Sequence, residues 1–183
     1  MERNLMVAGF GGQGIMLLGK FLSYAVCEST AKNVTFFPSY GAEQRGGTAN
    51  CYVVISDEEI GVPLGDSIND LIVMNDSSLK KFLYKLVPEG TLFINSSIVK
   101  SPIQRNDITV VKVPALDLSM EIGSAKVLNL VMLGVYVGYT QVVPEEVVLH
   151  TILQKLHKHP EVLAINEKAF QCGLKIGKEE RSR

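Results

Sequence analysis

The chain has 183 residues, a length that suits one domain. Lys and Arg number 18 and Asp and Glu number 19, so the formal net charge is -1. A non-specific nucleic-acid binder needs an excess of basic residues to displace counterions, so this balance argues against that class. Hydrophobic residues make up 46% of the chain and charged residues 20%, which is the composition of a globular protein.

Hydrophobic patterning predicts strands and helices that alternate over the first two thirds of the chain. Short apolar or β-branched runs bounded by glycine or proline predict strands. Apolar residues that recur every three or four positions, as from Ile15 to Val26, predict helices. The predicted strands span residues 5–8, 34–37, 48–56, 71–74, 91–95 and 108–113. The predicted helices span residues 15–27, 77–86, 116–122, 127–139, 145–158 and 161–176.

This order of elements predicts a single α/β domain over the whole chain. We expect a three-layer α/β/α sandwich with a mostly parallel, Rossmann-like sheet. The sheet core is expected over about residues 1–114, a helical part over about 115–177 and a frayed, charged tail over 178–183. Pro88-Glu89-Gly90 predicts a stop and turn, and Gly177 predicts the end of the last helix.

The three cysteines limit the metal chemistry of the chain. Cys27, Cys51 and Cys172 lie far apart and form no Cys-x-x-Cys pair. A disulfide framework, a structural zinc site or a four-cysteine cluster cannot be built from them alone, so we expect no metal site and a reducing, cytoplasmic setting. The N-terminal apolar run is too short for a signal peptide, and the longest apolar stretch is too short to span a bilayer. We therefore expect no membrane or nucleic-acid partner.

The first motif is GFGGQG, which follows the first predicted strand and precedes the first predicted helix. Glycines allow a tight turn and close approach of a ligand, and a helix start offers free N–H groups to an anion. Gly11, Gly12, Gln13 and Gly14 are therefore candidate binding residues. The alternative is a tight strand-to-helix turn without a ligand. A nicotinamide site is disfavoured because no Asp or Glu ends the second strand, and no Gly-Lys-Ser/Thr of a Walker loop follows.

The second motif lies between the second and third predicted strands, where open α/β sheets bind ligands. It combines glycines with an acid, an amide, a tyrosine and an arginine, whose guanidinium suits phosphate or carboxylate. The alternative is a turn whose charges are solvated or pair with each other, as Glu43 would with Arg45. The candidate binding residues of this motif are Tyr40, Gly41, Glu43, Gln44, Arg45, Gly46 and Gly47.

The two glycine motifs together resemble those of a known family. GFGGQG followed by PSYGAEQRGGTANCYVVIS, with PALDLSMEIGSAKVLNLVMLG later in the chain, is similar to the gamma subunit of 2-oxoacid:ferredoxin oxidoreductases. In that family an Asn precedes the Leu-Gly of a helix, a place that Asn129 occupies here. The resemblance extends from Gly9 to about the final helix, and it implies a three-layer α/β/α fold in agreement with the patterning.

The resemblance also implies a function in a complex. Enzymes of this family use thiamine diphosphate with Mg and iron–sulfur clusters to convert a 2-oxoacid and coenzyme A to acyl-CoA and CO2, and they reduce ferredoxin. Those cofactors are expected in partner subunits, named alpha, beta and a ferredoxin-like delta subunit, with coenzyme A as the possible ligand of this chain. The form YGAEQRGG shifts the expected substrate slightly towards 2-oxoglutarate or branched-chain oxoacids.

Two other kinds of function stay open at this point: a stand-alone nucleotide- or CoA-binding module, and a purely structural subunit. No catalytic residue is assigned in this chain, because no nucleophile, acid–base pair or metal set is recognisable. Cys51 is expected to be a core residue, and Asn75 the cap of the helix that follows it. Val131, Tyr136 and Tyr139 are expected on an apolar surface for partners or for self-association.

Overall fold

The computed structural model describes residues 2–40, 48–61, 67–157 and 160–183. Six strands form one sheet in the order β2-β3-β1-β4-β5-β6. β3 is antiparallel to both of its neighbours, whereas all other pairs are parallel, so β3 alone runs against the other strands. The strands are β1 (Glu2–Phe10), β2 (Asn33–Tyr40), β3 (Thr48–Ser56), β4 (Ile68–Val73), β5 (Leu86–Asn95) and β6 (Thr109–Val113).

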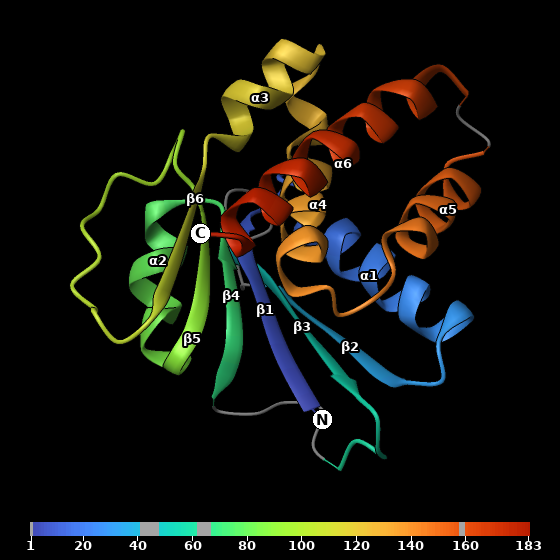
Figure 1. Ribbon diagram of the computed structural model, residues 1–183. Coiled ribbons are helices and arrows are strands. Elements are labelled where there is room, and N and C mark those ends of the chain that lie inside the picture. The colour runs from blue at the N-terminus through green and yellow to red at the C-terminus, as the bar shows by residue number, and fades with distance from the viewer. Residues whose placement is uncertain (1, 41–47, 62–66, 158–159) are drawn as a thin grey trace.

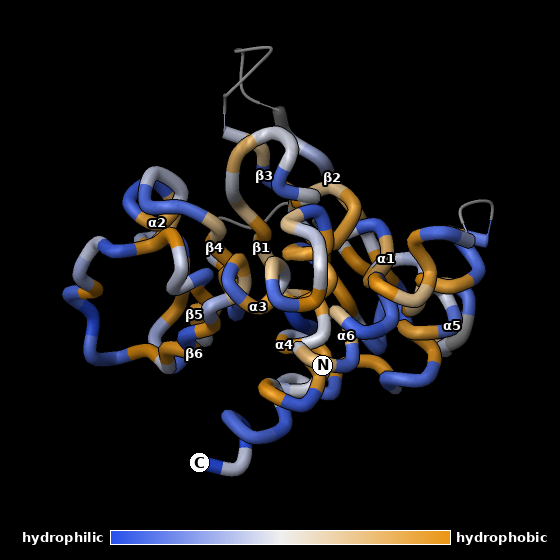
Figure 2. The backbone as a smooth tube through the Cα atoms, turned by 90° about the horizontal axis from the view of Figure 1, so that it is seen from above, coloured by the Kyte–Doolittle hydropathy of each residue, from blue (hydrophilic) through white to orange (hydrophobic). Residues whose placement is uncertain are grey.

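Helices cover both faces of the sheet, which confirms the predicted three-layer α/β/α arrangement (Figure 1). Seen from above, α2 lies on one side of the sheet, and α1, α4, α5 and α6 lie on the other (Figure 2). The α-helices are α1 (Ile15–Ser29), α2 (Asp76–Phe82), α3 (Ala115–Ile122), α4 (Leu128–Thr140), α5 (Glu145–Lys155) and α6 (Pro160–Arg181). Two 3-10 turns, η1 (Leu83–Lys85) and η2 (Ala125–Val127), follow α2 and precede α4.

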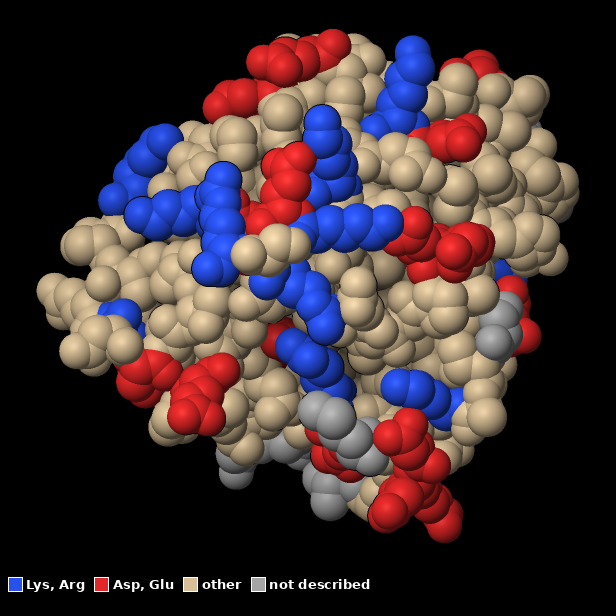
Figure 3. Space-filling view, viewed as in Figure 1, with Lys and Arg blue, Asp and Glu red and all other residues tan. Residues whose placement is uncertain are grey.

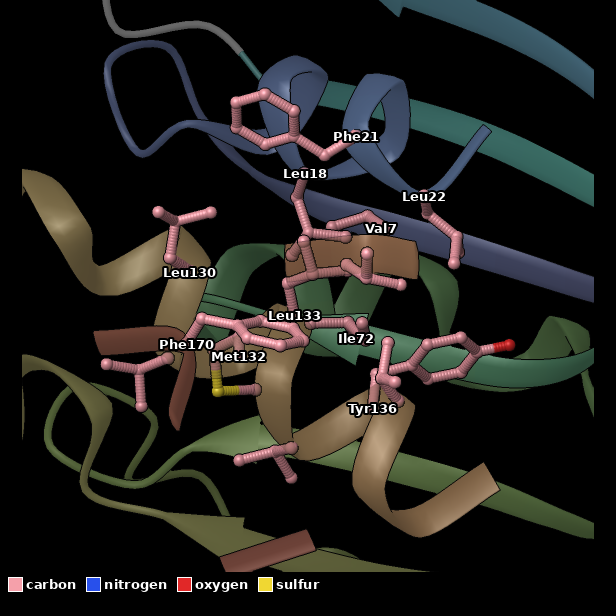
Figure 4. Packing of buried hydrophobic residues seen from close by; sticks show 14 of the residues in the cluster. Val7, Leu18, Phe21, Leu22, Ile72, Leu130, Met132, Leu133, Tyr136 and Phe170 are labelled. Atoms are coloured by element: carbon pink, nitrogen blue, oxygen red, sulfur yellow. The ribbon is translucent and has the colours of Figure 1, made fainter. Parts of the chain in front are cut away.

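The larger core lies between the sheet and the helices α1, α4 and α6. Val7 and Ile72 of the sheet meet Leu18 and Leu22 of α1 and Leu133 of α4, all of them buried (Figure 4). Complete removal of such side chains from water stabilises a fold by about 1.5–3 kcal/mol each. Successive side chains along the central strands point alternately into this core and into a smaller core under α2, as expected for a sheet buried on both faces.

Four glycines let α4 and α6 pack at very short range. Gly134 and Gly138 lie one turn apart on α4, as do Gly173 and Gly177 on α6. A Cβ atom at Gly173 would lie 1.9 Å from the carbonyl oxygen of Val131, and one at Gly134, Gly138 or Gly177 would also overlap the partner helix backbone. Only residues without a side chain permit this approach.

The prediction that Gly177 ends the last helix is therefore wrong. Gly177 is buried in the helix–helix contact, and α6 continues to Arg181. The tail over residues 178–183, expected to be frayed, is also largely helical. Its contacts are the pair of Lys178 with Glu145 and the hydrogen bond that Arg181 donates to the carbonyl of Tyr139. Glycine here serves close packing instead of helix termination.

Two further expectations differ from the structure. Pro88-Glu89-Gly90 lies inside β5, where it interrupts the pairing register with β4 and where Glu89 adopts a φ of 63°. The turn signal thus marks an irregularity within a strand. Val131 and Tyr136, expected at an apolar surface, are fully buried because α4 is covered by α6 as well as by the sheet, and Tyr139 is partly buried.

Charged side chains of both signs share the surface above α6. On the face drawn in Figure 3, Lys and Arg side chains gather around the C-terminal end of α6, with acidic side chains among them. The pairs Lys178–Glu145 and Arg183–Glu180 neutralise part of this charge locally. No helix in the described part of the chain is long and apolar enough to cross a membrane.

Candidate functional site at the carboxyl edge of the sheet

The first glycine motif forms the connection between β1 and α1 at the carboxyl edge of the sheet. Gly12 and Gly14 have φ values of 93° and 74°, a conformation that side chains of L-residues rarely adopt. A Cβ atom at Gly11 or Gly12 would meet no atom of the described residues within 4 Å, so this part of the chain leaves the outer side of the loop open. The loop therefore has both the backbone conformation and the accessibility that ligand approach requires.

Asn129, singled out by the family resemblance, contacts this loop. A Cβ atom at Gly14 would lie 2.6 Å from the Cγ atom of Asn129, and the Asn129 amide donates to the Gly14 carbonyl at 3.4 Å. Asn129 is buried in the first turn of α4. The contact fixes the start of α1 against the start of α4 and explains why the last residue of the motif is a glycine.

The side chain of Gln13 closes the loop from within. Its Oε1 atom accepts from the backbone N–H of Phe10 at 2.7 Å and from the Asn75 amide at 3.2 Å. Its Nε2 atom donates to the carbonyl of Met74 at 3.4 Å. Gln13 therefore ties the β1–α1 connection to the end of β4, and in this structure its amide is engaged with the protein itself.

The same edge continues through the start of α2. Asn75 caps that helix as predicted, because its Oδ1 atom accepts from the backbone N–H of Ser78 at 2.8 Å. Asp76 accepts from the backbone N–H groups of Lys100 at 3.1 Å and Ser101 at 2.7 Å. Hydrogen bonds from Ser101 and Lys100 lower the pKa of Asp76. The segment after β5 is thus held beside the segment after β4.

The first turn of α1 favours an anion. The helix begins after Gly14 without a side-chain cap, and its first turn contains no acidic residue. The first hydrogen bond of α1 between residues four apart runs from the N–H of Leu18 to the carbonyl of Gly14. The preceding N–H groups and the positive end of the helix dipole therefore lie at the glycine loop, where negative charge is stabilised.

The ends of the second motif lie directly beside the first. Thr48 at the start of β3 pairs with Phe10, the residue before Gly11, and Ala49 pairs with both Gly9 and Tyr40. Tyr40 is the last residue of β2. The other candidates of this motif lie outside the described residues: Gly41, Glu43, Gln44, Arg45, Gly46 and Gly47. The fold thus brings the flanks of the two motifs together at one edge.

Cys51 belongs to the core, as expected from its place in an apolar strand. Its side chain is fully buried, and its Sγ atom lies 3.6 Å from the carbonyl oxygen of Ile15. Burial raises the pKa of the Cys51 thiol to about 12, which disfavours the thiolate that nucleophilic chemistry needs. Among the described residues no group of three His, Cys, Asp or Glu side chains lies close enough to hold a metal ion.

One cationic groove was not singled out by the sequence. A hollow of about 460 Å3 lies between the segment after β5 and the edge strand β6, lined by Lys100, Arg105 and Lys112 over an apolar floor. Arg105 donates to Asp107 and to the carbonyls of Leu83 and Leu86. These cations are scattered over residues 100–112, so no compact motif signals them.

Comparison with known proteins now decides the family. A family model described as pyruvate ferredoxin/flavodoxin oxidoreductase matches residues 4–176. The chain belongs to this family. The resemblance inferred from the two glycine motifs and from Asn129 is thereby confirmed, and so is its extent over nearly the whole chain.

Relatives of the chain differ in length. The ketoisovalerate oxidoreductase subunit VorA of Methanothermobacter marburgensis is 34% identical over 94% of this chain, which spans only 36% of VorA. The 2-oxoglutarate synthase subunit KorC of Methanocaldococcus jannaschii is 32% identical over 98% of this chain and 96% of KorC. The chain therefore spans about a third of one relative and nearly the whole of the other.

Solved structures of family members have the same fold. The gamma subunit of a keto/oxoacid ferredoxin oxidoreductase from Geobacter sulfurreducens matches with a TM-score of 0.87 at 25% identity, over 98% of both chains. A 2-oxoglutarate:ferredoxin oxidoreductase from Magnetococcus marinus, with 2-oxoglutarate, coenzyme A and succinyl-CoA bound, matches with a TM-score of 0.90 at 25% identity. That match covers 97% of this chain and 31% of the other. The predicted α/β fold is confirmed by both.

Proposed function

We propose that this chain is the gamma subunit of a thiamine-diphosphate-dependent 2-oxoacid:ferredoxin oxidoreductase complex. The observation that supports this most directly is the match in length. The chain corresponds to almost all of KorC but to 36% of VorA and 31% of the Magnetococcus chain. One structural unit is thus a whole polypeptide in some relatives and a part of a longer one in others, as expected for a subunit of a larger enzyme.

The reaction of the complex is the conversion of a 2-oxoacid and coenzyme A to an acyl-CoA and CO2. The carbon–carbon bond beside the carbonyl breaks, the acyl group forms a thioester with coenzyme A, and the two electrons released pass to ferredoxin. Thiamine diphosphate, Mg and iron–sulfur clusters belong to the alpha, beta and ferredoxin-like delta subunits, in the cytoplasm. The names of the VorA and KorC relatives support a branched-chain oxoacid or 2-oxoglutarate as the substrate.

The role proposed for this chain is assembly of the complex together with engagement of coenzyme A at the carboxyl edge. The open outer side of Gly11 and Gly12, next to an uncapped helix start, suits the phosphate groups of coenzyme A. Arg45 and the other residues of the second motif are proposed as further contacts. Gln13 is proposed as a positioning residue, because its amide holds Phe10, Met74 and Asn75 in place.

Reconstitution tests the assignment as a subunit. The chain is produced alone and together with candidate alpha, beta and delta subunits, and reduction of an electron acceptor is followed with thiamine diphosphate, coenzyme A and a panel of 2-oxoacids. We expect no turnover by the isolated chain and substrate-dependent turnover by the complex. Robust turnover by the chain alone, or a fully active enzyme assembled without it, would contradict the proposal.

A substitution in the second motif tests engagement of coenzyme A. In the reconstituted complex, Arg45→Ala should raise the KM for coenzyme A while assembly stays intact, since it removes a cation from the phosphate-binding edge. Arg183→Ala is the matched control, because Arg183 is an exposed arginine paired with Glu180 at the end of α6. If Arg45→Ala instead abolishes assembly and leaves the KM of the residual complex unchanged, the loop is an interface element.

A further inference from the structure

Among the described residues, no helix packs on one face of the half of the sheet that β2 and β3 form. α1 packs on β2 and β3 from the side of the larger core, where Val34 and Phe36 contact that core. On the opposite face, α2 packs on β1 and β4. Figure 2 shows α2 well away from β2. The alternate residues of β2 therefore face two different environments, one packed and one open.

The open face carries an aromatic pair. Phe37 lies directly across from Tyr52 of β3, which in turn pairs with the buried Met6 of β1. The side chain of Phe37 is 43% exposed, and Tyr52 is half-buried at the margin of the smaller core. Thr35 and Ser39 flank Phe37 on the same face of β2. We call Thr35, Phe37, Ser39 and Tyr52 the β2–β3 surface.

A second aromatic ring provides a comparison. Tyr24, on the outer side of α1, is also 43% exposed. Its ring, however, lies under the ammonium group of Lys155, 4.3 Å from the ring centroid, and Lys155 pairs with Glu28 at 2.7 Å. Phe37 has no aromatic or cationic contact with the described residues. The two rings are equally exposed, but Lys155 lies over the ring of Tyr24, whereas no cation or aromatic ring of the described residues lies against Phe37.

The edge of β2 indicates how a partner would bind. β2 is an outer strand of the sheet, and Pro38 in it has no N–H group to donate to an added strand. Extension of the sheet by a partner strand is therefore disfavoured. A partner would instead contact the face, through the side chains of Phe37 and Tyr52.

We propose that the β2–β3 surface docks on the separate subunit that corresponds to the remaining two thirds of VorA. The inference rests on the proposed function. VorA and the Magnetococcus chain contain this unit as 36% and 31% of their lengths, so in those proteins a much larger part of the same polypeptide accompanies it. The surface also continues along β3 to Thr48, which lies on the same face of the strand as Tyr52 and at the flank of the second motif. A subunit seated there adjoins the carboxyl edge.

Association of purified subunits tests this surface. Phe37→Ser and the matched control Tyr24→Ser are each titrated with the co-purified alpha and beta subunits, and urea unfolding of each variant checks its fold. We expect Phe37→Ser to weaken association at least tenfold and Tyr24→Ser to match the unsubstituted chain. Ser39→Arg, which adds a charge to the surface without removing a packed ring, should also weaken association at least tenfold in a folded chain.

The outcomes separate this proposal from the proposed function. If the unsubstituted chain associates but Phe37→Ser and Ser39→Arg associate equally well, the surface is not the docking face and the subunit assignment stands. If the unsubstituted chain does not associate with those subunits at all, the proposed function itself is wrong. If Phe37→Ser abolishes only self-association of the isolated chain, the surface binds a second copy and the proposal is overturned.

Discussion

The two faces of the sheet are covered very unequally. On one face α1, α4 and α5 form a layer, and α6 lies over α4, so that α4 is buried along nearly its whole length. On the other face the only α-helix of the described chain is α2, which spans seven residues. The difference indicates that the first face holds the fold together, whereas the second face and the carboxyl edge have room for contacts with other molecules.

The largest effect is expected where α4 and α6 meet. Gly173→Ala places a methyl group 1.9 Å from the Val131 carbonyl oxygen, and this clash can be relieved only if the helices separate. We expect the free energy of unfolding to fall by about 3 kcal/mol or more, as for a severely overpacked core. Urea unfolding measures it. Gly11→Ala is the control, because a Cβ atom there meets none of the described residues within 4 Å. Equal stability of the two variants would contradict the close packing.

The sequence predicts the strands and helices well, because each depends on local periodicity. Each of the six strands and of the helices α1 to α6 overlaps a predicted span, although β5 begins at Leu86 and includes the predicted turn at residues 88–90. The sequence does not reveal that α4 and α6 pack through four glycines, namely Gly134, Gly138, Gly173 and Gly177. A glycine near the end of a helical run resembles a terminator, and only the partner helix reveals its packing role.

The sequence predicts only those parts of the candidate site that depend on neighbouring residues in the chain. A glycine-rich connection after a strand is a local signal, and the structure places the first motif at the carboxyl edge beside the ends of the second. What the sequence does not indicate is that Gln13 points inward to Asn75, or that Asn129 packs against Gly14, because both contacts join segments far apart in the chain. The open aromatic face around Phe37 likewise depends on which helix covers which strand.

The second-largest loss of stability is expected for a buried carboxylate on the well-packed face. Asp70 is fully buried and accepts hydrogen bonds from Arg3 and, at 3.0 Å, from the Tyr136 hydroxyl of α4. Asp70→Ala leaves both donors without this partner, and the free energy of unfolding should fall by about 3 kcal/mol.

The control for this change lies on the thinly covered face. Asp107→Ala removes the carboxylate of an ion pair with Arg105 in which the Asp107 side chain is 44% exposed. Exposed pairs contribute about 0–1 kcal/mol, so the control should lose far less stability than Asp70→Ala. Thermal or urea unfolding of both variants checks this. If Asp107→Ala lost more free energy of unfolding than Asp70→Ala, the packed face would not be the one that contributes more to stability.

Tyr136 predicts an alkaline limit for the same packed face. Burial, together with the neighbouring Asp70 carboxylate, raises the pKa of Tyr136 well above its usual value. The folded state therefore requires the neutral hydroxyl. The contribution of neutral Tyr136 to the free energy of unfolding is fully present below the pKa of about 10 that a tyrosine has in the unfolded chain. Above that pH the contribution decreases by up to about 1.4 kcal/mol for each pH unit.

The variant Tyr136→Phe isolates this contribution, because it cannot ionise. Urea midpoints measured from pH 8 to pH 11 should fall less steeply for the variant than for the unsubstituted chain, although the variant is less stable at pH 8 since Asp70 loses a donor. Identical slopes would show that another group sets the alkaline limit.

The smallest effect is expected at the carboxyl edge, where Asn75 caps α2 and also donates to Gln13 at 3.2 Å. Asn75→Ala should lower the free energy of unfolding by about 1 kcal/mol, the usual value of an N-cap. Ser77→Ala, in the exposed first turn of the same helix, should change it little.

A second substitution at the same position separates the cap from the link to Gln13. Asn75→Asp keeps an oxygen that accepts from Ser78 and adds a charge that the start of α2 favours, but it removes the donor to Gln13. If the link orders the glycine loop, Asn75→Asp should remain nearly as stable as the unsubstituted chain, yet amide hydrogen exchange should accelerate in the residues around Gly11 and Gly12. Unchanged exchange there would mean that the other hydrogen bonds of Gln13, to Phe10 and Met74, hold the loop by themselves. The glycine loop would then keep its order without its link to the start of α2.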